Sequence, residues 1–421
     1  MHALEKILAR AAGKEAVQAG EMVTAAVDLA EVNDLYLQVI QSFRAMGGKK
    51  VWDPEKVTFV FDHYCPPPTP KAADNHRAMR EFIQEQGIPH LFDIEAGVCH
   101  QVMPEAGLVY PGMVLVATDS HTTTHGAFGA FATGVGATDL AVVLATGSLW
   151  FTVPEVMEVH LTGRLNPGVE AKDVVLQLLG QLGADGAVYQ AIEYTGPGLK
   201  NLSMAQRMVI CNMAVEMGAK TTYIAPDEVT WAYMETRGIK EFPVPVTDPD
   251  YVYSGRVELD LSQVQPVVAA PHSVDNVHPI EKYAGQPIDQ AFIGTCTGGR
   301  LEDIAGAVKV MGGRKVAPGT RLIITPASKE VYLRALEAGY IQALIEAGAT
   351  VTSPGCGPCI GIHQGMLGPG EVCITASSRN FPGRMGSSEA EIYLASPLTV
   401  AASAVTGRIT DPRQFLGMEG A

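Results

Sequence analysis

The sequence lacks the features that identify membrane-spanning, secreted and repetitive proteins. It contains no run of 18 apolar residues, and its start does not combine positive charge with a hydrophobic segment. Such segments are needed to span a bilayer or to direct secretion. Short-period repeats and low-complexity tracts are also missing. We therefore expect a globular protein without a membrane partner.

Basic residues are scarce compared with acidic ones. The chain has 30 Lys and Arg against 45 Asp and Glu, which gives a formal net charge of −15. This balance disfavours a nucleic-acid partner, because the phosphate backbone requires a basic face. It would also repel a carboxylate substrate at long range, so a site for such a substrate would need its own arginines.

Cysteine is infrequent, and its distribution does not indicate disulfides. The seven cysteines are an odd number, scattered along a long chain. This usage argues against a disulfide framework and favours a reducing compartment. We therefore expect a cytoplasmic location.

The length and the hydrophobic pattern predict an α/β protein with several domains. A chain of 421 residues is too long for one ordinary core. Strand-like apolar runs that end in polar tips alternate with helical segments, which is typical of mostly parallel sheets. We predict three α/β domains, at residues 1–152, 153–275 and 276–421, with a proline-rich junction at residues 243–271.

The expected elements carry candidate functional residues at their ends. Strands are predicted at 23–27, 57–61, 113–117, 156–161, 290–294, 321–325, 349–352 and 371–375. Helices are predicted at 35–43, 71–86, 138–150, 169–182, 302–311, 329–346 and 388–394. In sheets of this kind, ligands bind at the carboxyl ends of the strands.

Two cysteines three positions apart follow one of these strands. Cys356 and Cys359 lie in a Cys-Gly-Pro-Cys turn, and Cys296 lies on a separate glycine-rich turn. A Cys-x-x-Cys pair can be a redox pair, but thioredoxin-like folds place it early in a small domain. A structural zinc site would need a fourth ligand nearby. Three thiolates with one open position are typical of a catalytic metal centre.

Acidic residues stand close to histidines at two other strand ends. Asp62 precedes His63, and Asp119 lies two residues before His121, while His100 lies on a third glycine-rich loop. A lone histidine is more often a structural group. Two such Asp/His motifs, together with His100 on a third loop, favour acid–base or orienting roles.

A helix and a loop carry the remaining candidates. A capping box at Ser203 begins a helix on which Asn212 and Glu216 share one face. Arg379 and Arg384 bracket a short turn after the strand at 371–375. Such a pair is often only solvated surface, but its position favours a clamp for a carboxylate.

Together these motifs resemble the large subunits of the two-subunit hydro-lyases of the aconitase superfamily, the 3-isopropylmalate dehydratase and homoaconitase type. The resemblance covers the chain from about residue 20 to the C-terminus. It rests on the order of the cysteine turns and of the motifs at 62–64, 97–101, 117–124, 210–219 and 378–384.

The resemblance implies an aconitase-like fold of three α/β domains around a [4Fe–4S] cluster, without the swivelling fourth domain. Cys296, Cys356 and Cys359 would be the cluster ligands, and the fourth iron would bind the substrate. The reaction would be the reversible dehydration of a malate-type 2-hydroxy di- or tricarboxylate. The first interpretation is 3-isopropylmalate dehydratase of leucine biosynthesis; homoaconitase and a dimethylmalate or citramalate dehydratase are alternatives.

The same resemblance assigns roles to the other candidates. His63, oriented by Asp62, would protonate the departing hydroxyl. Supporting or substrate-holding roles would belong to His100, Asp119, Ser120, His121, Glu216, Asn33, Asn212, Arg379 and Arg384.

Three places depart from the family pattern. Gly298 and Ser378 stand where asparagine is usual, and residues 35–38 replace the usual Ile-Thr-Ala-Pro type sequence. The first two departures would place smaller groups close to the cluster, and the third would change a pocket wall. They therefore bear on the choice of substrate.

The resemblance also implies a protein partner. In the family, a serine activated by a neighbouring arginine removes a proton from the substrate, and it lies on a mobile domain. This sequence stops at Ala421 with no matching motif. We therefore expect the base on a separate small subunit that carries the swivelling domain.

Two other classes of function fit part of the pattern. One is a non-catalytic scaffold that kept the fold, and the other is a zinc-dependent lyase or hydrolase that uses the same three thiolates. The presence of both Asp/His motifs and both arginines argues against a scaffold. Colour distinguishes the metals, because zinc is colourless and iron–sulfur clusters absorb visible light.

Overall fold

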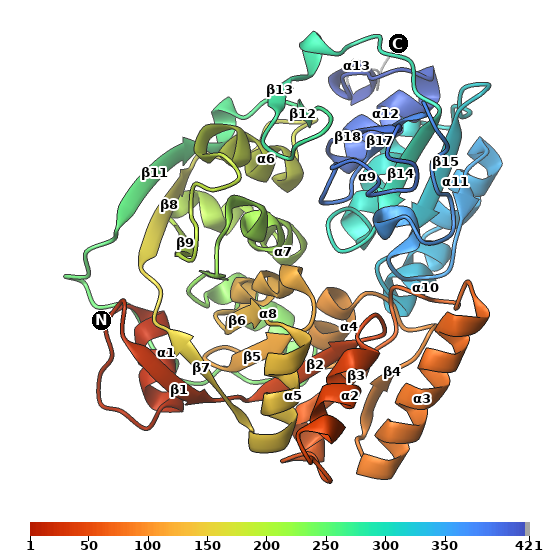
Figure 1. The fold of residues 1–421 in the computed structure, drawn as a ribbon. Coiled ribbons are helices and arrows are strands. Elements are labelled where there is room, and N and C mark those ends of the chain that lie inside the picture. The colour runs from red at the N-terminus through yellow and green to blue at the C-terminus, as the bar shows by residue number, and fades with distance from the viewer. Residues whose placement is uncertain (417–421) are drawn as a thin grey trace. The chain divides into compact units, whose positions relative to one another are not determined.

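The computed structural model describes residues 1–416 (Figure 1). The chain divides into two compact units, each made of several segments. Unit 1 comprises Met1–Ile94, Cys99–Thr162 and Asp185–Leu259; unit 2 comprises Glu95–Val98, Gly163–Ala184 and Asp260–Ala421. The three-domain division stays a prediction.

The main sheet of unit 1 has five parallel strands in the order β4-β3-β2-β5-β6. The strands are β2 (Leu29–Asn33), β3 (Val57–Val60), β4 (His90–Phe92), β5 (Val114–Ala117) and β6 (Phe131–Gly134). All residues of β2, β3 and β5 are buried, as expected for a parallel sheet covered on both faces. Because β2 is central, the ends of β3 and β5 flank its own end.

Unit 1 contains two smaller sheets. β1 (Met22–Ala26) pairs antiparallel with β7 (Ser148–Thr152). Four strands form the other sheet in the order β10-β9-β8-β11: β8 (Val156–Thr162), β9 (Ala191–Thr195), β10 (Thr221–Tyr223) and β11 (Gly255–Asp260). The α-helices of unit 1 are α1 (Ala3–Ala11), α2 (Leu37–Ala45), α3 (Pro70–Gln86), α4 (Cys99–Glu105), α5 (Ala137–Thr146), α7 (Met204–Asn212) and α8 (Glu228–Glu235).

Unit 2 is built on one seven-stranded sheet in the order β13-β12-β18-β17-β14-β15-β16. Its strands are β12 (Val267–Ala269), β13 (Val277–Pro279), β14 (Gln290–Gly294), β15 (Arg321–Thr325), β16 (Thr350–Val351), β17 (Val372–Thr375) and β18 (Glu391–Leu394). The strands from β18 to β16 are parallel, and β12 and β13 add an antiparallel edge. The α-helices are α6 (Ala171–Leu182), α9 (Leu301–Met311), α10 (Lys329–Glu337), α11 (Tyr340–Ala347), α12 (Pro397–Thr406) and α13 (Arg413–Leu416).

Short 3-10 helices join these elements in both units. They are η1 (Pro54–Lys56), η2 (Ser120–Phe128), η3 (Pro197–Asn201), η4 (Met213–Met217), η5 (Leu261–Gln263), η6 (Ile280–Lys282) and η7 (Gly357–Ile360). Each unit has its own hydrophobic core on its main sheet, with Val32 and Phe59 in one and Ile293 and Ile324 in the other. Within the described part of the chain, no helix is both long enough and apolar enough to cross a membrane.

The predicted α/β class with mostly parallel sheets is confirmed. The strands predicted at 290–294 and 321–325 coincide with β14 and β15. The helix predicted at 71–86 begins one residue earlier, with Thr69 as N-cap and Pro70 in the first turn. Proline is well tolerated there, because its missing N–H would have no partner inside the helix. The helix ends at Gln86, as predicted, and Gly87 follows it in the left-handed region.

The helix predicted at residues 388–394 is wrong. Residues Glu391–Leu394 form strand β18, which pairs parallel with β17 along its whole length. The stretch is short, and Ile392 and Leu394 are buried on the sheet. Pairing with a strand that is already in place outweighs the weak local preference for helix.

Two other predicted helices are interrupted by glycine. The segment 329–346 divides into α10 and α11 at Gly339, whose φ is 77°. The segment 138–150 ends as a helix at Thr146, because Gly147 has a φ of 70° and starts the turn into β7. A glycine in this conformation ends a helix at little cost.

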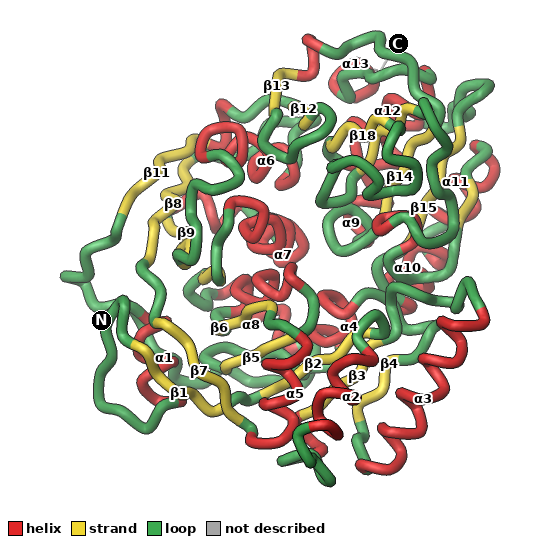
Figure 2. The backbone as a smooth tube through the Cα atoms, in the orientation of Figure 1, coloured by secondary structure: helices red, strands yellow, loops and turns green. Residues whose placement is uncertain are grey.

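The predicted proline-rich junction is partly irregular. Between α8 and β11 the chain has no helix or strand (Figure 2). Regular structure returns in the second half of the stretch as two short strands, β11 and β12, which agrees with a sequence that is irregular but favours short strands there.

Candidate active site

The acid–imidazole residues lie at the carboxyl ends of adjacent parallel strands in unit 1. Asp62 and His63 follow β3, and Asp119 follows β5, while Asn33 and Asp34 stand at the end of β2 between them. The carboxyl ends of parallel strands meet at one edge of a sheet. Residues that are far apart in the sequence therefore come together here.

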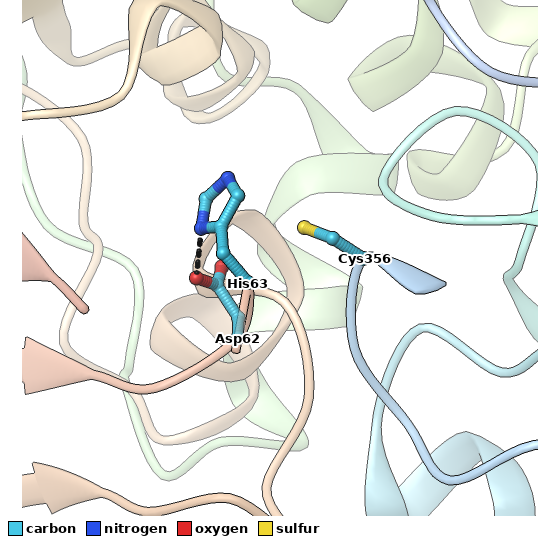
Figure 3. A group of neighbouring side chains, drawn as sticks. All are labelled: Asp62, His63 and Cys356. Atoms are coloured by element: carbon cyan, nitrogen blue, oxygen red, sulfur yellow. Dashed lines mark hydrogen bonds and ion pairs between the residues drawn. The ribbon is translucent and has the colours of Figure 1, made fainter. Parts of the chain in front are cut away.

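His63 faces two carboxylates. Its Nδ1 donates to Asp62 Oδ1 at 2.6 Å (Figure 3), and Asp34 Oδ1 lies 3.5 Å from the same nitrogen. Asp62 is itself fixed, because its Oδ2 accepts from the Cys99 N–H at 2.9 Å. With Nδ1 bonded to a carboxylate, Nε2 of His63 is the nitrogen left to exchange a proton. It lies 3.7 Å from Asp119 Oδ2.

Asp119 joins two more histidines. Its Oδ1 accepts from His100 Nε2 at 3.0 Å and from the backbone N–H of His121 at 2.7 Å. This second bond makes Asp119 the N-cap of η2, whose first residue is the half-buried Ser120. Burial alone would raise the pKa of Asp119, but the hydrogen bonds from His100 and His121 outweigh it and hold the pKa well below its usual value. Asp119 is therefore a fixed negative charge at neutral pH.

Asn212, at the end of the capped helix α7, and Glu216, on the following turn η4, contact residues of η2. His121 Nε2 donates to Glu216 Oε1 at 2.8 Å, and Asn212 Nδ2 donates to Thr124 Oγ1 at 2.8 Å. The capping box predicted at Ser203 is confirmed. The α-helix ends at Asn212, however, and Glu216 lies on the tighter η4 turn, so the two do not share one continuous α-helical face.

Two buried polar side chains on β2 have no hydrogen-bond partner within residues 1–416. They are the carboxyl group of Glu31 and the amide of Asn33. The two are two positions apart, so they face the same side of the strand. Buried polar groups are normally paired, which makes this edge a natural place for a polar ligand or an ordered water. Asn33 was a candidate from the sequence, whereas Glu31 was missed.

The charge of Glu31 should govern a pH dependence of stability. Burial, reinforced by the carboxylates of Asp62 and Asp119, raises the pKa of Glu31 well above its usual value. The folded pKa lies above the unfolded one, so the wild type should lose unfolding free energy as pH rises from the unfolded pKa toward the folded one. Glu31→Gln removes this ionisation. The melting temperature of Glu31→Gln minus that of wild type should therefore be larger at pH 9 than at pH 5. An equal difference at both pH values would contradict the account.

The three candidate metal ligands lie in unit 2, on loops after β14 and β16. Cys296 follows β14. Cys356 directly precedes η7, and Cys359 lies within it. Cys356, drawn in Figure 3, packs with Val98 and Ala327 in a small hydrophobic group, and Cys296 packs against the same group. The backbone N–H of Cys359 donates to the Cys356 carbonyl at 3.2 Å. The structure thus brings all three predicted ligands onto two loops of one unit.

The backbone at these cysteines is tightly constrained. Thr295, directly before Cys296, has a φ of 69°, which is rare for a β-branched residue. Gly357, directly after Cys356, has a φ of 55°, and a Cβ there would lie 2.7 Å from Thr325 Oγ1. Strained backbone of this kind occurs where the surrounding structure holds a site in place.

Of the two candidate arginines, Arg384 contacts the cysteine loop. Its Nη2 lies 3.5 Å from Cys359 Sγ. Arg379 follows β17 and is half-buried. The turn between them is anchored by the buried Asn380, which donates to the Ala270 carbonyl at 2.9 Å. The arginine loop is therefore fixed in unit 2 with the cysteine loops.

Similarity to known proteins identifies the family. The sequence model of the aconitase family (aconitate hydratase) matches residues 5–407. The chain belongs to the aconitase family. It is 53% identical over 413 residues to large subunit 1 of 3-isopropylmalate dehydratase from Methanopyrus kandleri, covering 98% of this chain and 99% of that one. It is 50% identical over 422 residues to a probable methanogen homoaconitase large subunit from Methanothermobacter thermautotrophicus, covering 99% of each.

Likeness to a solved structure is weaker. The crystal structure of Thermococcus kodakaraensis aconitase X in its holo-form covers 90% of this chain and 89% of its own, with a TM-score of 0.49 and 15% identity. A likeness this distant carries no weight for function.

The aconitase family implies a hydro-lyase with an iron–sulfur cluster, and the cysteines of unit 2 fit such a group. Cys296, Cys356 and Cys359 are in no disulfide, and thiolates are the usual ligands of iron–sulfur clusters. The other cysteine of unit 2, Cys373, is buried in β17, and burial raises its pKa. Such a thiol is a poor metal ligand. Cys296, Cys356 and Cys359 therefore remain as the candidate ligands of unit 2.

Proposed function

We propose that this chain is the cluster-bearing large subunit of a 3-isopropylmalate dehydratase. This hydro-lyase would dehydrate a malate-type 2-hydroxy acid and rehydrate it with the hydroxyl on the neighbouring carbon. One observation carries the proposal: a single aconitase-family chain combines the three-thiol set of unit 2 with histidines that are each bonded to a carboxylate in unit 1. The relative that is 53% identical carries this name.

We take the cofactor to be a [4Fe–4S] cluster held by Cys296, Cys356 and Cys359. When bound, such a cluster supplies a Lewis acid at its open position, which weakens the bond to the leaving hydroxyl. Arg384 contacts Cys359, so it would hold a substrate carboxylate next to this ligand loop.

The residues of unit 1 would handle the proton of dehydration. His63 is oriented by Asp62 through Nδ1, and we assign to its Nε2 the delivery of a proton to the departing hydroxyl. Asp119 stays ionised and keeps the rings of His100 and His121 in fixed orientations. Glu216 fixes the other nitrogen of His121. The rings therefore need little reorganisation as charge develops, which lowers the barrier.

The arginines would bind substrate carboxylates. The chain carries a formal charge of −15, so a dianionic substrate needs local positive charge. Arg379 and Arg384 provide it on one fixed loop. Bidentate contacts from such side chains also set the orientation of the carboxylate.

The proposal includes a second, small subunit. The relatives at 53% and 50% identity are named as large subunits, which implies a smaller partner for each. Removing a proton next to a carboxylate requires a positioned base. We assign that base to the small subunit, which would also contribute to the choice of substrate.

Homoaconitase is the second candidate. The relative with that name is only slightly less similar to this chain than the dehydratase relative. The two reactions share the same chemistry and differ in the substituent that the substrate carries. A substrate panel with 3-isopropylmalate and homoisocitrate therefore separates them.

The metal content of the chain tests the cofactor. Protein purified without oxygen should contain about four irons and about four sulfides per chain and absorb at roughly 400 nm. Exposure to oxygen and a chelator should remove both the colour and the activity of the reconstituted enzyme. Stoichiometric zinc in a colourless, active protein would refute the cluster and favour a zinc enzyme.

A further inference from the structure

A second carboxylate–imidazole pair lies beside His63, and the proposed chemistry does not use it. Asp34 follows β2, and His76 lies in the middle of α3; both side chains are fully buried. Asp34 Oδ2 accepts from His76 Nε2 at 3.0 Å. The two residues are far apart in the sequence, so only the fold reveals this contact.

Asp34 accepts hydrogen bonds from the loop that carries His63. Its Oδ1 accepts from the backbone N–H of His63 at 3.1 Å, and its Oδ2 accepts from the N–H of Tyr64 at 2.7 Å. The same Oδ1 lies 3.5 Å from Nδ1 of the His63 ring. One carboxylate therefore fixes both the backbone and the ring of the proposed proton donor.

His76 in turn fixes Asp34. Its neighbours on the buried face of α3 are apolar, among them Ala72, Met79 and Phe82, so a histidine here is unexpected for packing alone. The ring stacks on Phe61 with centroids 4.4 Å apart. A buried polar ring is costly unless it is hydrogen-bonded, and its bond goes to Asp34.

The charge on Asp34 depends on these contacts. Burial alone would raise its pKa, but the hydrogen bonds from His63 and His76 outweigh it and hold the pKa below its usual value. Asp34 is thus a buried carboxylate with partners for both oxygens. Removing one partner of such a group leaves an uncompensated polar atom, which is a large perturbation.

We propose that Asp34 and His76 are positioning residues that keep the His63 ring aligned with Asp62 for proton delivery. The inference rests on the proposed function, in which His63 is the proton donor. Proton transfer needs close alignment, and a small displacement of the donor slows the chemical step more than it weakens binding. The alternative is that the pair only anchors a turn, which would affect stability and not the chemical step.

Three variants test this role in the complete two-subunit enzyme. Asp34→Asn keeps the size of the side chain but presents an amide N–H to another donor. It should lower kcat for 3-isopropylmalate about 10- to 100-fold, the effect of one hydrogen bond to a charged group, with KM within about threefold. His76→Phe keeps the stack on Phe61 but removes the hydrogen-bond donor to Asp34, so its loss of kcat should be of the same size. His76→Gln restores an amide donor and should recover most of the lost turnover.

A matched control lies on the same helix. Asp74 on α3 is exposed and pairs with Arg77 at the surface, at 2.6 Å. Asp74→Asn should leave kcat and KM unchanged. Wild-type kcat in His76→Phe, or equal losses in His76→Phe and His76→Gln, would overturn the proposal. A lower melting temperature with unchanged kcat would also overturn it.

A second readout does not depend on the reaction. Amide hydrogen exchange in the single chain should be faster at residues 62–65 in Asp34→Asn and His76→Phe, and unchanged in Asp74→Asn. If the wild-type subunits convert no 2-hydroxy acid, the proposed function fails, and the exchange measurement then tests the structural half of the inference, that Asp34 and His76 hold the His63 loop in place. Exchange at residues 62–65 equal to wild type in Asp34→Asn would then overturn it.

Discussion

Replacing Cys356 by alanine should abolish both iron retention and activity. Cys356 belongs to a small hydrophobic packing group against which Cys296 also packs, and the turn that follows Cys356 carries Cys359. With only two thiolates left, the site cannot hold a cluster that three thiolates anchor. Iron and sulfide analysis, and visible absorption after purification without oxygen, check the result. Cys296→Ala and Cys359→Ala should behave in the same way.

Cys373→Ala is the matched control. Cys373 lies in the same unit, fully buried in β17, and burial raises its pKa, so it is a packing residue. The variant should keep its iron and most of its activity, with some loss of stability from the small cavity. A Cys356→Ala protein that still carries a cluster and turns over substrate would disprove the ligand assignment.

Arg384→Lys should keep the iron but lose most of the turnover. Cluster retention depends on the thiolates, whereas Arg384 has been assigned to a substrate carboxylate. Lysine keeps the charge but cannot make the two-pronged contact of a guanidinium. Losing one such contact in the transition state costs about 2–4 kcal/mol, which corresponds to a fall of about 30- to 1000-fold in kcat/KM. Steady-state kinetics with equal iron content in both proteins give the comparison.

Arg334→Lys provides the control for this substitution. Arg334 lies on α10 of the same unit, exposed, with Glu330 at 3.8 Å as its ionic partner. Surface pairs of this kind contribute little, so the variant should match wild type in both iron content and rate. An unchanged rate in Arg384→Lys would remove this residue from the site.

Local sequence patterns were sufficient for the elements that carry the cysteines and the first Asp–His pair. The apolar run before Cys296 predicted β14 with its correct bounds, and the run before Asp62 predicted β3 to within one residue. Both strands are mostly apolar, fully buried segments that end in a polar turn, the pattern expected for buried parallel strands.

The pattern fails at β2 because buried polar residues interrupt it. Glu31 and Asn33 are polar residues in a fully buried strand, so no apolar run marks its position. Sequence patterns are expected to fail where a site requires buried polar groups. The hydrogen bond between Asp34 and His76 could not be predicted from the sequence either, because the two residues are 42 positions apart and meet only in the folded chain.

Turnover of 3-isopropylmalate by this chain with and without a small subunit tests the central claim most directly. The account predicts that the chain purified without oxygen carries its cluster but shows negligible isomerisation alone. Adding the small subunit should give interconversion of 3-isopropylmalate and 2-isopropylmalate, with homoisocitrate converted more slowly or not at all. Full isomerase activity from this polypeptide alone would contradict the account, as would an inactive pair of subunits with an intact cluster.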